Sequence, residues 1–258
     1  MLSISSIAVV ASLLATSGAG YDTQAAAKQS VHVREVLQVL KVGTLAEREA
    51  ALADVLALDA ARKSVEILAA VAGELSRVNA ILEAREQAWR NGKPGPAEEG
   101  DLRNYYHLLV SVVSGSENPI VIQPLIGAIE TGGMARDALA RFGSRAFPFV
   151  TAIARNHAEA MHIHGALLTL EKMVTTGVLS PREKTEVVLL AAERMEGTQR
   201  DVVWSAAMKL ALATGDKDLR TTVERIADGT LVVSTSGEED MSGWVRHSAG
   251  LALGRPIK

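Results

Sequence analysis

His157, Glu159, His162 and His164 lie within eight residues and are the side chains in this sequence best suited to metal chemistry. Imidazole together with carboxylate is a usable ligand set for zinc or iron. In a helix, at about 100° per residue, Glu159 and His162 share one face while His164 points away from His162. At most two ligands therefore converge locally. His157, Glu159 and His162 are weak metal-ligand candidates, beside the simpler interpretation that they are capping or surface side chains.

No other residue pattern indicates a catalytic centre. The sequence has no cysteine, which excludes thiol nucleophiles, disulfides and thiolate metal sites. It also lacks a G-x-S-x-G elbow, an S-x-x-K motif and a glycine-rich phosphate-binding loop. We therefore expect no cofactor and no catalytic residue. A metal-binding protein or metal-dependent enzyme that uses the histidine cluster stays open as the alternative.

The histidines lie in a region where four spaced sets of apolar residues recur. Each set has i, i+3, i+4, i+7 spacing, which places its members on one face of a helix. The sets begin at Ala135, Ile163, Val203 and Val245, so successive sets are 28, 40 and 42 residues apart. This spacing is typical of helix–turn–helix units and predicts stacked helical repeats. The four sets are Ala135, Ala138, Leu139 and Phe142; Ile163, Ala166, Leu167 and Leu170; Val203, Ala206, Ala207 and Leu210; and Val245, Ser248, Ala249 and Ala252.

Two of these helices resemble the second helices of HEAT repeats. Residues 245–254, VRHSAGLALG, are similar to the family's hydrophobic-Arg-x-x-Ala-x-x-Ala-Leu-Gly signature, and residues 135–143, ARDALARFG, resemble it nearly as well. The middle two helices depart from it, because His164 and Trp204 occupy the arginine position and neither helix has the terminal glycine. The resemblance covers residues 120–254. It implies a right-handed alpha-solenoid of antiparallel helix pairs with a concave inner surface, and it implies no substrate.

The arginine position of this signature supplies the candidates for binding a partner. Arg136, His164, Trp204 and Arg246 each follow the first apolar residue of a set by one. In the family this position borders the inner surface, and Arg and Trp are frequent in binding hot spots. The alternative is that the two arginines form ion pairs with neighbouring repeats and that Trp204 packs under a loop.

The composition favours an all-α protein and disfavours nucleic acid as a partner. Hydrophobic residues make up 48% of the chain but aromatic residues only 3%, which favours close-packed helices over a β-sandwich. The 27 Lys and Arg are balanced by 30 Asp and Glu, so the chain offers no large attraction for a phosphate backbone. We expect a monomeric, non-catalytic helical-repeat scaffold that binds a protein partner and does not bind nucleic acid.

The first 20 residues resemble a signal peptide. They contain no charged side chain, and their apolar middle, from Ile7 to Ala15, is too short to span a membrane. The basic segment that usually begins a signal peptide is missing. We expect a secreted or periplasmic protein, with a cytoplasmic protein that has an apolar first helix as the alternative. No later stretch approaches the ~18 apolar residues of a membrane span.

Helix-start and loop signals divide the rest of the chain. Thr44 with Glu47, and Ser180 with Glu183, fit capping boxes. The apolar residues of the stretch from Leu68 to Trp89 follow steps of three and four until Arg85 breaks the seam, the pattern of a long helix packed along a neighbour. The predicted segments are a signal peptide at 1–20, a flexible or partly helical lead-in at 21–43, a helical hairpin at 44–90, a linker loop at 91–100 and a HEAT-like repeat domain at 101–258.

Overall fold

The structure, a computed structural model, describes residues 32–57, 64–94, 101–237 and 240–255. These residues are mostly helical, which confirms the predicted all-α class. Strand structure in this part of the chain is confined to β1 (Thr198–Gln199) and β2 (Ser234–Thr235), which pair in parallel. The predicted signal peptide at 1–20 lies outside the described residues.

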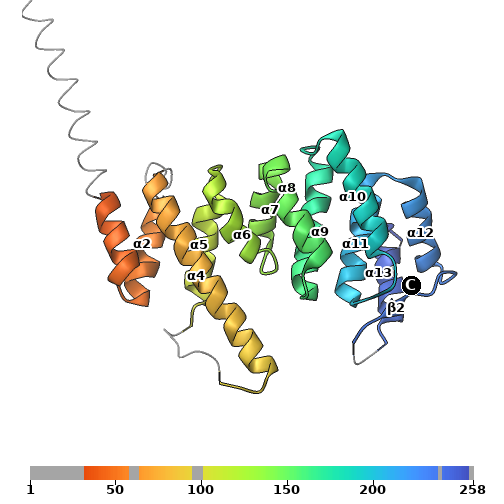
Figure 1. Ribbon diagram of the computed structural model, residues 1–258, viewed down its shortest axis with the longest axis horizontal. Coiled ribbons are helices and arrows are strands. Elements are labelled where there is room, and N and C mark those ends of the chain that lie inside the picture. Colours follow the sequence, from red (N-terminus) through yellow and green to blue (C-terminus); the bar gives the residue numbers. More distant parts are fainter. Residues whose placement is uncertain (1–31, 58–63, 95–100, 238–239, 256–258) are drawn as a thin grey trace, which may run out of the picture.

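The helices follow the longest axis of the molecule largely in chain order, except that α13 folds back between α11 and α12, and the C-terminal half of α4 projects beyond its neighbours (Figure 1). A helix at 32–42 comes first. It is followed by α2 (Leu45–Ala57), α4 (Val65–Arg90), α5 (Arg103–Ser114), η1 (Pro119–Val121), α6 (Ile122–Gly127), α7 (Gly133–Phe142), η2 (Gly143–Arg145), α8 (Phe147–Asn156), α9 (Ala160–Thr175), α10 (Pro181–Arg194), α11 (Asp201–Thr214), α12 (Lys217–Ala227) and α13 (Ser242–Ala252). Each described helix is either too short or too polar to cross a membrane.

The four apolar sets are buried, as their spacing predicts. In α7, α9 and α11 every member is at most 7% exposed. In α13, Val245 and Ala249 are fully buried, while Ser248 and Ala252 are partly exposed at the end of the stack. Helix α7 packs against α9, α9 against α11, and α11 against α13. Each of these four helices also packs against the helix that precedes it, from α6 with α7 to α12 with α13.

Local capping signals explain where several of these helices begin. Ser180 accepts a hydrogen bond from the Glu183 amide while the Glu183 carboxylate accepts one from the Ser180 amide, so the predicted capping box is present. Thr44 and Glu47 make the same reciprocal pair at α2. Such pairs satisfy amides that have no partner within the helix, which fixes the first turn.

The N-terminal helices share their core with α5. Both α2 and α4 pack mainly against α5 rather than against each other. Within the described residues, one connected cluster of buried apolar side chains runs from Val36 to Ala249. The core is therefore continuous from α4 to α5.

The predicted buried seam of α4 is correct only in its first half. Leu68, Val71, Leu75 and Val78 are buried, whereas Trp89 is 79% exposed. The expectation that Trp89 packs along a neighbour is therefore wrong. The physical reason is that the C-terminal half of α4 extends past the helices against which its first half packs (Figure 1).

A glycine brings α9 unusually close to the turn after α6. A Cβ atom placed on Gly165 would lie 2.4 Å from the carbonyl oxygen of Ile129, a backbone atom of the turn after α6. No residue other than glycine fits such a contact without a backbone shift. This close approach holds the start of α9 beside the turn between α6 and α7, where the candidate site lies.

Candidate functional site

A small pocket forms where the C-terminal half of α4 meets α5, the turn after α6 and the start of α9. Its volume is about 90 Å³. Its lining mixes apolar surface with polar and charged side chains, among them four glutamates; the polar residues are Asn79, Glu83, Glu86, Gln87, Arg90, Tyr106, Glu130, Thr131, Glu159 and His162. The hydroxyls of Tyr106 and Thr131 are 2.7 Å apart and close one wall. The pocket therefore joins side chains from four elements that are distant in the sequence.

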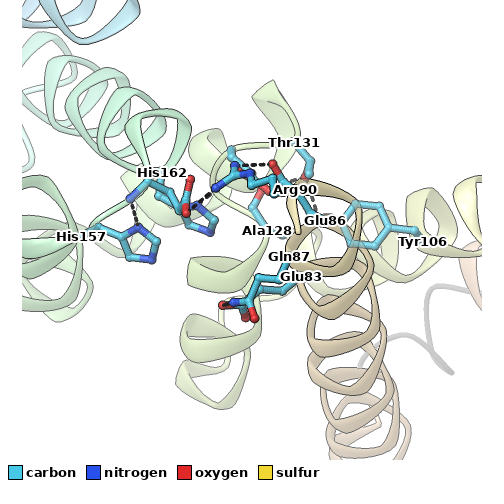
Figure 2. A network of polar contacts seen from close by, with 11 residues as sticks. Glu83, Glu86, Gln87, Arg90, Tyr106, Ala128, Thr131, His157 and His162 are labelled. Carbon is cyan, nitrogen blue, oxygen red and sulfur yellow. Dashed lines mark hydrogen bonds and ion pairs between the residues drawn. The ribbon is translucent and has the colours of Figure 1, made fainter. Parts of the chain in front are cut away.

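The structure brings His157 and His162 together at this pocket. Their rings are stacked, with centroids 4.1 Å apart and an interplanar angle of 21° (Figure 2). His157 ends α8 and lies two residues before Glu159, whose backbone N–H donates a hydrogen bond to Nδ1 of His157 at 3.1 Å. Nδ1 of His157 thereby gives a partner to an amide at the start of α9 that has none within the helix.

The two imidazoles have opposite electrostatic surroundings. Nδ1 of His162 lies 3.2 Å from Oε2 of Glu130, and this carboxylate raises the pKa of His162 despite partial burial. Burial lowers the pKa of His157, and the charge of His162 lowers it further. Two stacked imidazolium ions would repel each other, so the geometry favours one proton on the pair, held by His162.

An ion pair joins the end of α4 to the start of α9. Nη1 of Arg90 lies 2.6 Å from Oε1 of Glu159, and Nη2 lies 2.5 Å from Oε1 of Glu86 on its own helix. Figure 2 shows Arg90 reaching from α4 toward the stacked histidines. The guanidinium of Arg90 lowers the pKa of Glu159 by donating a hydrogen bond to its carboxylate. We call the Arg90–Glu159 ion pair the clasp.

The three weak metal-ligand candidates do not converge on a common point for a metal. Glu159 is bound to Arg90, His157 accepts a backbone amide, and His162 faces Glu130. Within the ranges that the structure describes, no group of three His, Asp or Glu side chains is arranged to hold a metal ion. The geometry of these residues therefore gives the metal-dependent alternative no support.

The four partner-binding candidates all reach toward a neighbouring repeat or loop. Nδ1 of His164 lies 2.9 Å from the Val202 carbonyl oxygen of α11, and Arg136 is close enough to lower the pKa of His164, which burial lowers most. Trp204 is 2% exposed, and its indole N–H donates to the Ser234 carbonyl oxygen.

Arg246 of α13 follows the first apolar residue of its set by one, as the other three candidates do. It is exposed, and its guanidinium lies over Gly229, where an added Cβ would be 3.2 Å from Cζ. In the structure His164 and Trp204 thus contact α11 and the loop before α13, respectively, and Arg246 contacts the turn after α12. The polar groups of Trp204 and His164 are bound within the protein, whereas the side chain of Arg246 is exposed.

Sequence reasoning missed the residues that complete the pocket. Arg90 pairs with Glu159 across 69 positions of the chain, and Glu130 meets His162 from a different repeat. The spacing of Glu86 and Arg90, four apart on a predicted helix, was a signal for their mutual ion pair only. Nothing in the sequence indicates that this helix ends beside α9.

Comparisons with protein-family models, with curated proteins and with solved structures find no match to this chain.

Proposed function

We propose that this protein is a non-catalytic helical-repeat scaffold that binds a protein partner along its stacked second helices, α7, α9, α11 and α13. The observation that carries the proposal is the burial of the whole apolar stripe in α7, α9 and α11 and of half of it in α13, together with the packing of these helices in one row. Repeats of this kind contact only their neighbours and build an extended surface well suited to binding proteins. We propose a HEAT-like alpha-solenoid of antiparallel pairs as the arrangement.

The helices α7, α9, α11 and α13 pack more closely against one another than α8 packs against α10, which supports a concave face on the former. Contacts between successive second helices are extensive, whereas those between α8 and α10 are few. In a curved stack the helices on the inner side of the bend approach each other more closely. We therefore infer that α7, α9, α11 and α13 line the inner side.

Exposed apolar side chains recur at one edge of this layer. Met134, Met161 and Trp244 lie in the first turns of α7, α9 and α13 and are 46%, 46% and 41% exposed. Large apolar and aromatic side chains at such exposure are the usual anchors of a protein interface. Together with Arg246, they are the contacts that we expect a partner to use.

Site-specific photo-crosslinking in the native host tests this proposal. A photoreactive residue at Met134, Met161 or Trp244 should capture one and the same partner. Leu189 is the matched control, because its side chain is 63% exposed but lies on α10, which is not one of the four proposed binding helices. Equal capture from Leu189, or no common partner from the three positions, would refute binding at this edge. Loss of that partner with Arg246→Ala would extend the contact to α13.

We also propose that the protein is exported, on the basis of the apolar and uncharged stretch at 1–20. Sequencing the N-terminus of the protein from its native host tests this. A mature chain that begins after residue 17 to 20 is the expected result, and a retained Met1 would count against it.

A further inference from the structure

We propose that His157 is an acid-sensitive latch: its protonation opens the clasp and frees the projecting end of α4 from the repeats. This inference goes beyond partner binding and does not depend on it. It rests on the hydrogen bond that Nδ1 accepts, on the stacking of His157 against His162, and on the position of Glu159 between two cations that compete for it.

The first step is the hydrogen bond at the start of α9. Because Nδ1 of His157 accepts the Glu159 amide at 3.1 Å, that nitrogen cannot carry a proton in the closed structure. Protonation of His157 turns this acceptor into a donor, and the amide loses its partner. The turn that leads from α8 into α9 then has one hydrogen bond fewer, which destabilises its closed conformation. The turn between α8 and α9 is therefore closed only when His157 is neutral.

The second step is repulsion within the stacked pair. His162 is held beside Glu130, which favours the charged form of His162. When His157 is protonated as well, two positive rings lie with their centroids 4.1 Å apart. Like charges at this distance favour separation of the rings, and His157, which follows the last residue of α8, lies in the turn before α9.

The third step is competition for Glu159. Its carboxylate is bound by Arg90 of α4 in the closed structure, and the charge of His157 also acts on it. A positive His157 two residues away offers Glu159 a cation on its own side of the junction. Since Arg90 also binds Glu86, it keeps a partner within α4 when Glu159 leaves. Protonation of His157 therefore shifts Glu159 away from α4 and opens the clasp.

Other charged groups around the pair set the pH at which the clasp opens. Carboxylates favour the protonated form of His157 and face it from three elements; they are Glu83 of α4, Glu130 of the turn after α6, and Glu159. On α5, Tyr106 faces the pocket but is bound to Thr131. Toward α10, the cation of Arg155 is bound by Glu186 and Glu193. Burial and the charge of His162 oppose the protonation of His157. The clasp should therefore open at a pH below the ordinary pKa of a histidine.

A pair of spin labels measures the opening directly. The chain has no cysteine, so cysteines introduced at exposed Lys93, after α4, and exposed Ala152, on α8, are the only labelling sites. We expect one short distance at about pH 8 and a longer, broader distribution at about pH 5, with a midpoint below the ordinary histidine value of about 6.5. Far-UV circular dichroism should stay unchanged over this range. An unchanged distance distribution would refute the proposal.

Two variants separate the latch from general acid sensitivity. In His157→Asn, a side-chain oxygen can accept the same amide but does not titrate, so the short distance should persist at about pH 5. In Arg90→Gln, the clasp lacks its cation and the long distance should appear already at about pH 8. His247→Asn, an exposed histidine on α13, is the control and should behave as the wild type. Acid opening that persists in His157→Asn would overturn the assignment.

Discussion

Gly165 shows how one residue fixes the position of α9 and, with it, the histidine pair. An added Cβ would meet the Ile129 carbonyl oxygen at 2.4 Å, and a backbone atom cannot rotate away as a side chain can. We expect Gly165→Ala to lower the free energy of unfolding by about 1–3 kcal/mol. Denaturant titration measures the change.

Gly250→Ala is the matched control for this substitution. Gly250 lies inside α13 and has no atom within 4 Å of the position that a Cβ would take. There the higher helix propensity of alanine should raise stability by about 0.5–1 kcal/mol. If both substitutions changed stability in the same direction, the close approach at Gly165 would not be the cause.

The contact between Glu130 and His162 should make stability depend on pH with a defined sign. The pKa of His162 is raised in the folded protein, so the stabilisation is fully present below the unfolded histidine value and is lost as pH rises through the folded value. Glu130 has a lowered pKa and stays ionised across this range. Glu130→Gln should therefore cost more stability at about pH 6 than at about pH 8.5.

Chemical denaturation of Glu130→Gln and wild type at both pH values measures this difference. Glu196→Gln, an exposed substitution in the turn after α10, serves as the control and should have little effect at either pH. A penalty for Glu130→Gln that does not change with pH would show that His162 gains nothing from this carboxylate.

At the scale of helices, the sequence predicts what is locally encoded. The capping box at Ser180 and the cap at Asp216 place the starts of α10 and α12, because their hydrogen bonds span three residues or fewer. The apolar stripes predict which face of α7, α9 and α11 is buried. Periodicity failed at Trp89, because apolar spacing cannot show where the neighbouring helix ends.

The site is the reverse case, since it depends on packing between distant elements. His157 and His162 are five positions apart, and the sequence alone indicates that they form a cluster. Their stacking depends on the turn between α8 and α9 and not on helical spacing. Arg90 and Glu130 enter only because α4 and the turn after α6 lie beside α9. A single sequence does not show which distant elements lie side by side, so these contacts could not be predicted from it.

Ala207 tests the close packing of α11 against its neighbours. It is fully buried within the repeated stripe. Ala207→Leu should lower the free energy of unfolding by about 1–3 kcal/mol through overpacking. Ala152→Leu, an exposed position on α8, is the control and should have a much smaller effect. A change near zero on denaturant titration of Ala207→Leu would mean that this face has room to spare.

For the whole molecule, the row of second helices predicts how stability is distributed. Helices α9 and α11 each bury seven residues and have a second helix on both sides, whereas α13 buries Val245 and Ala249 and has one. In a stack whose members contact only their neighbours, protection should fall toward the last helix.

Hydrogen exchange of the native protein tests this distribution. Amides in α13 should exchange about tenfold or more faster than those in α9 and α11, because opening α13 exposes the least apolar surface. Val245→Ala should speed exchange in α13 and, less strongly, in α11, while leaving α5 unchanged. In a globular core that unfolds as a single unit, this substitution would lower protection equally from α5 to α13. That result would contradict the stacked arrangement, whereas a graded loss would show that coupling between helices decays with distance along the row.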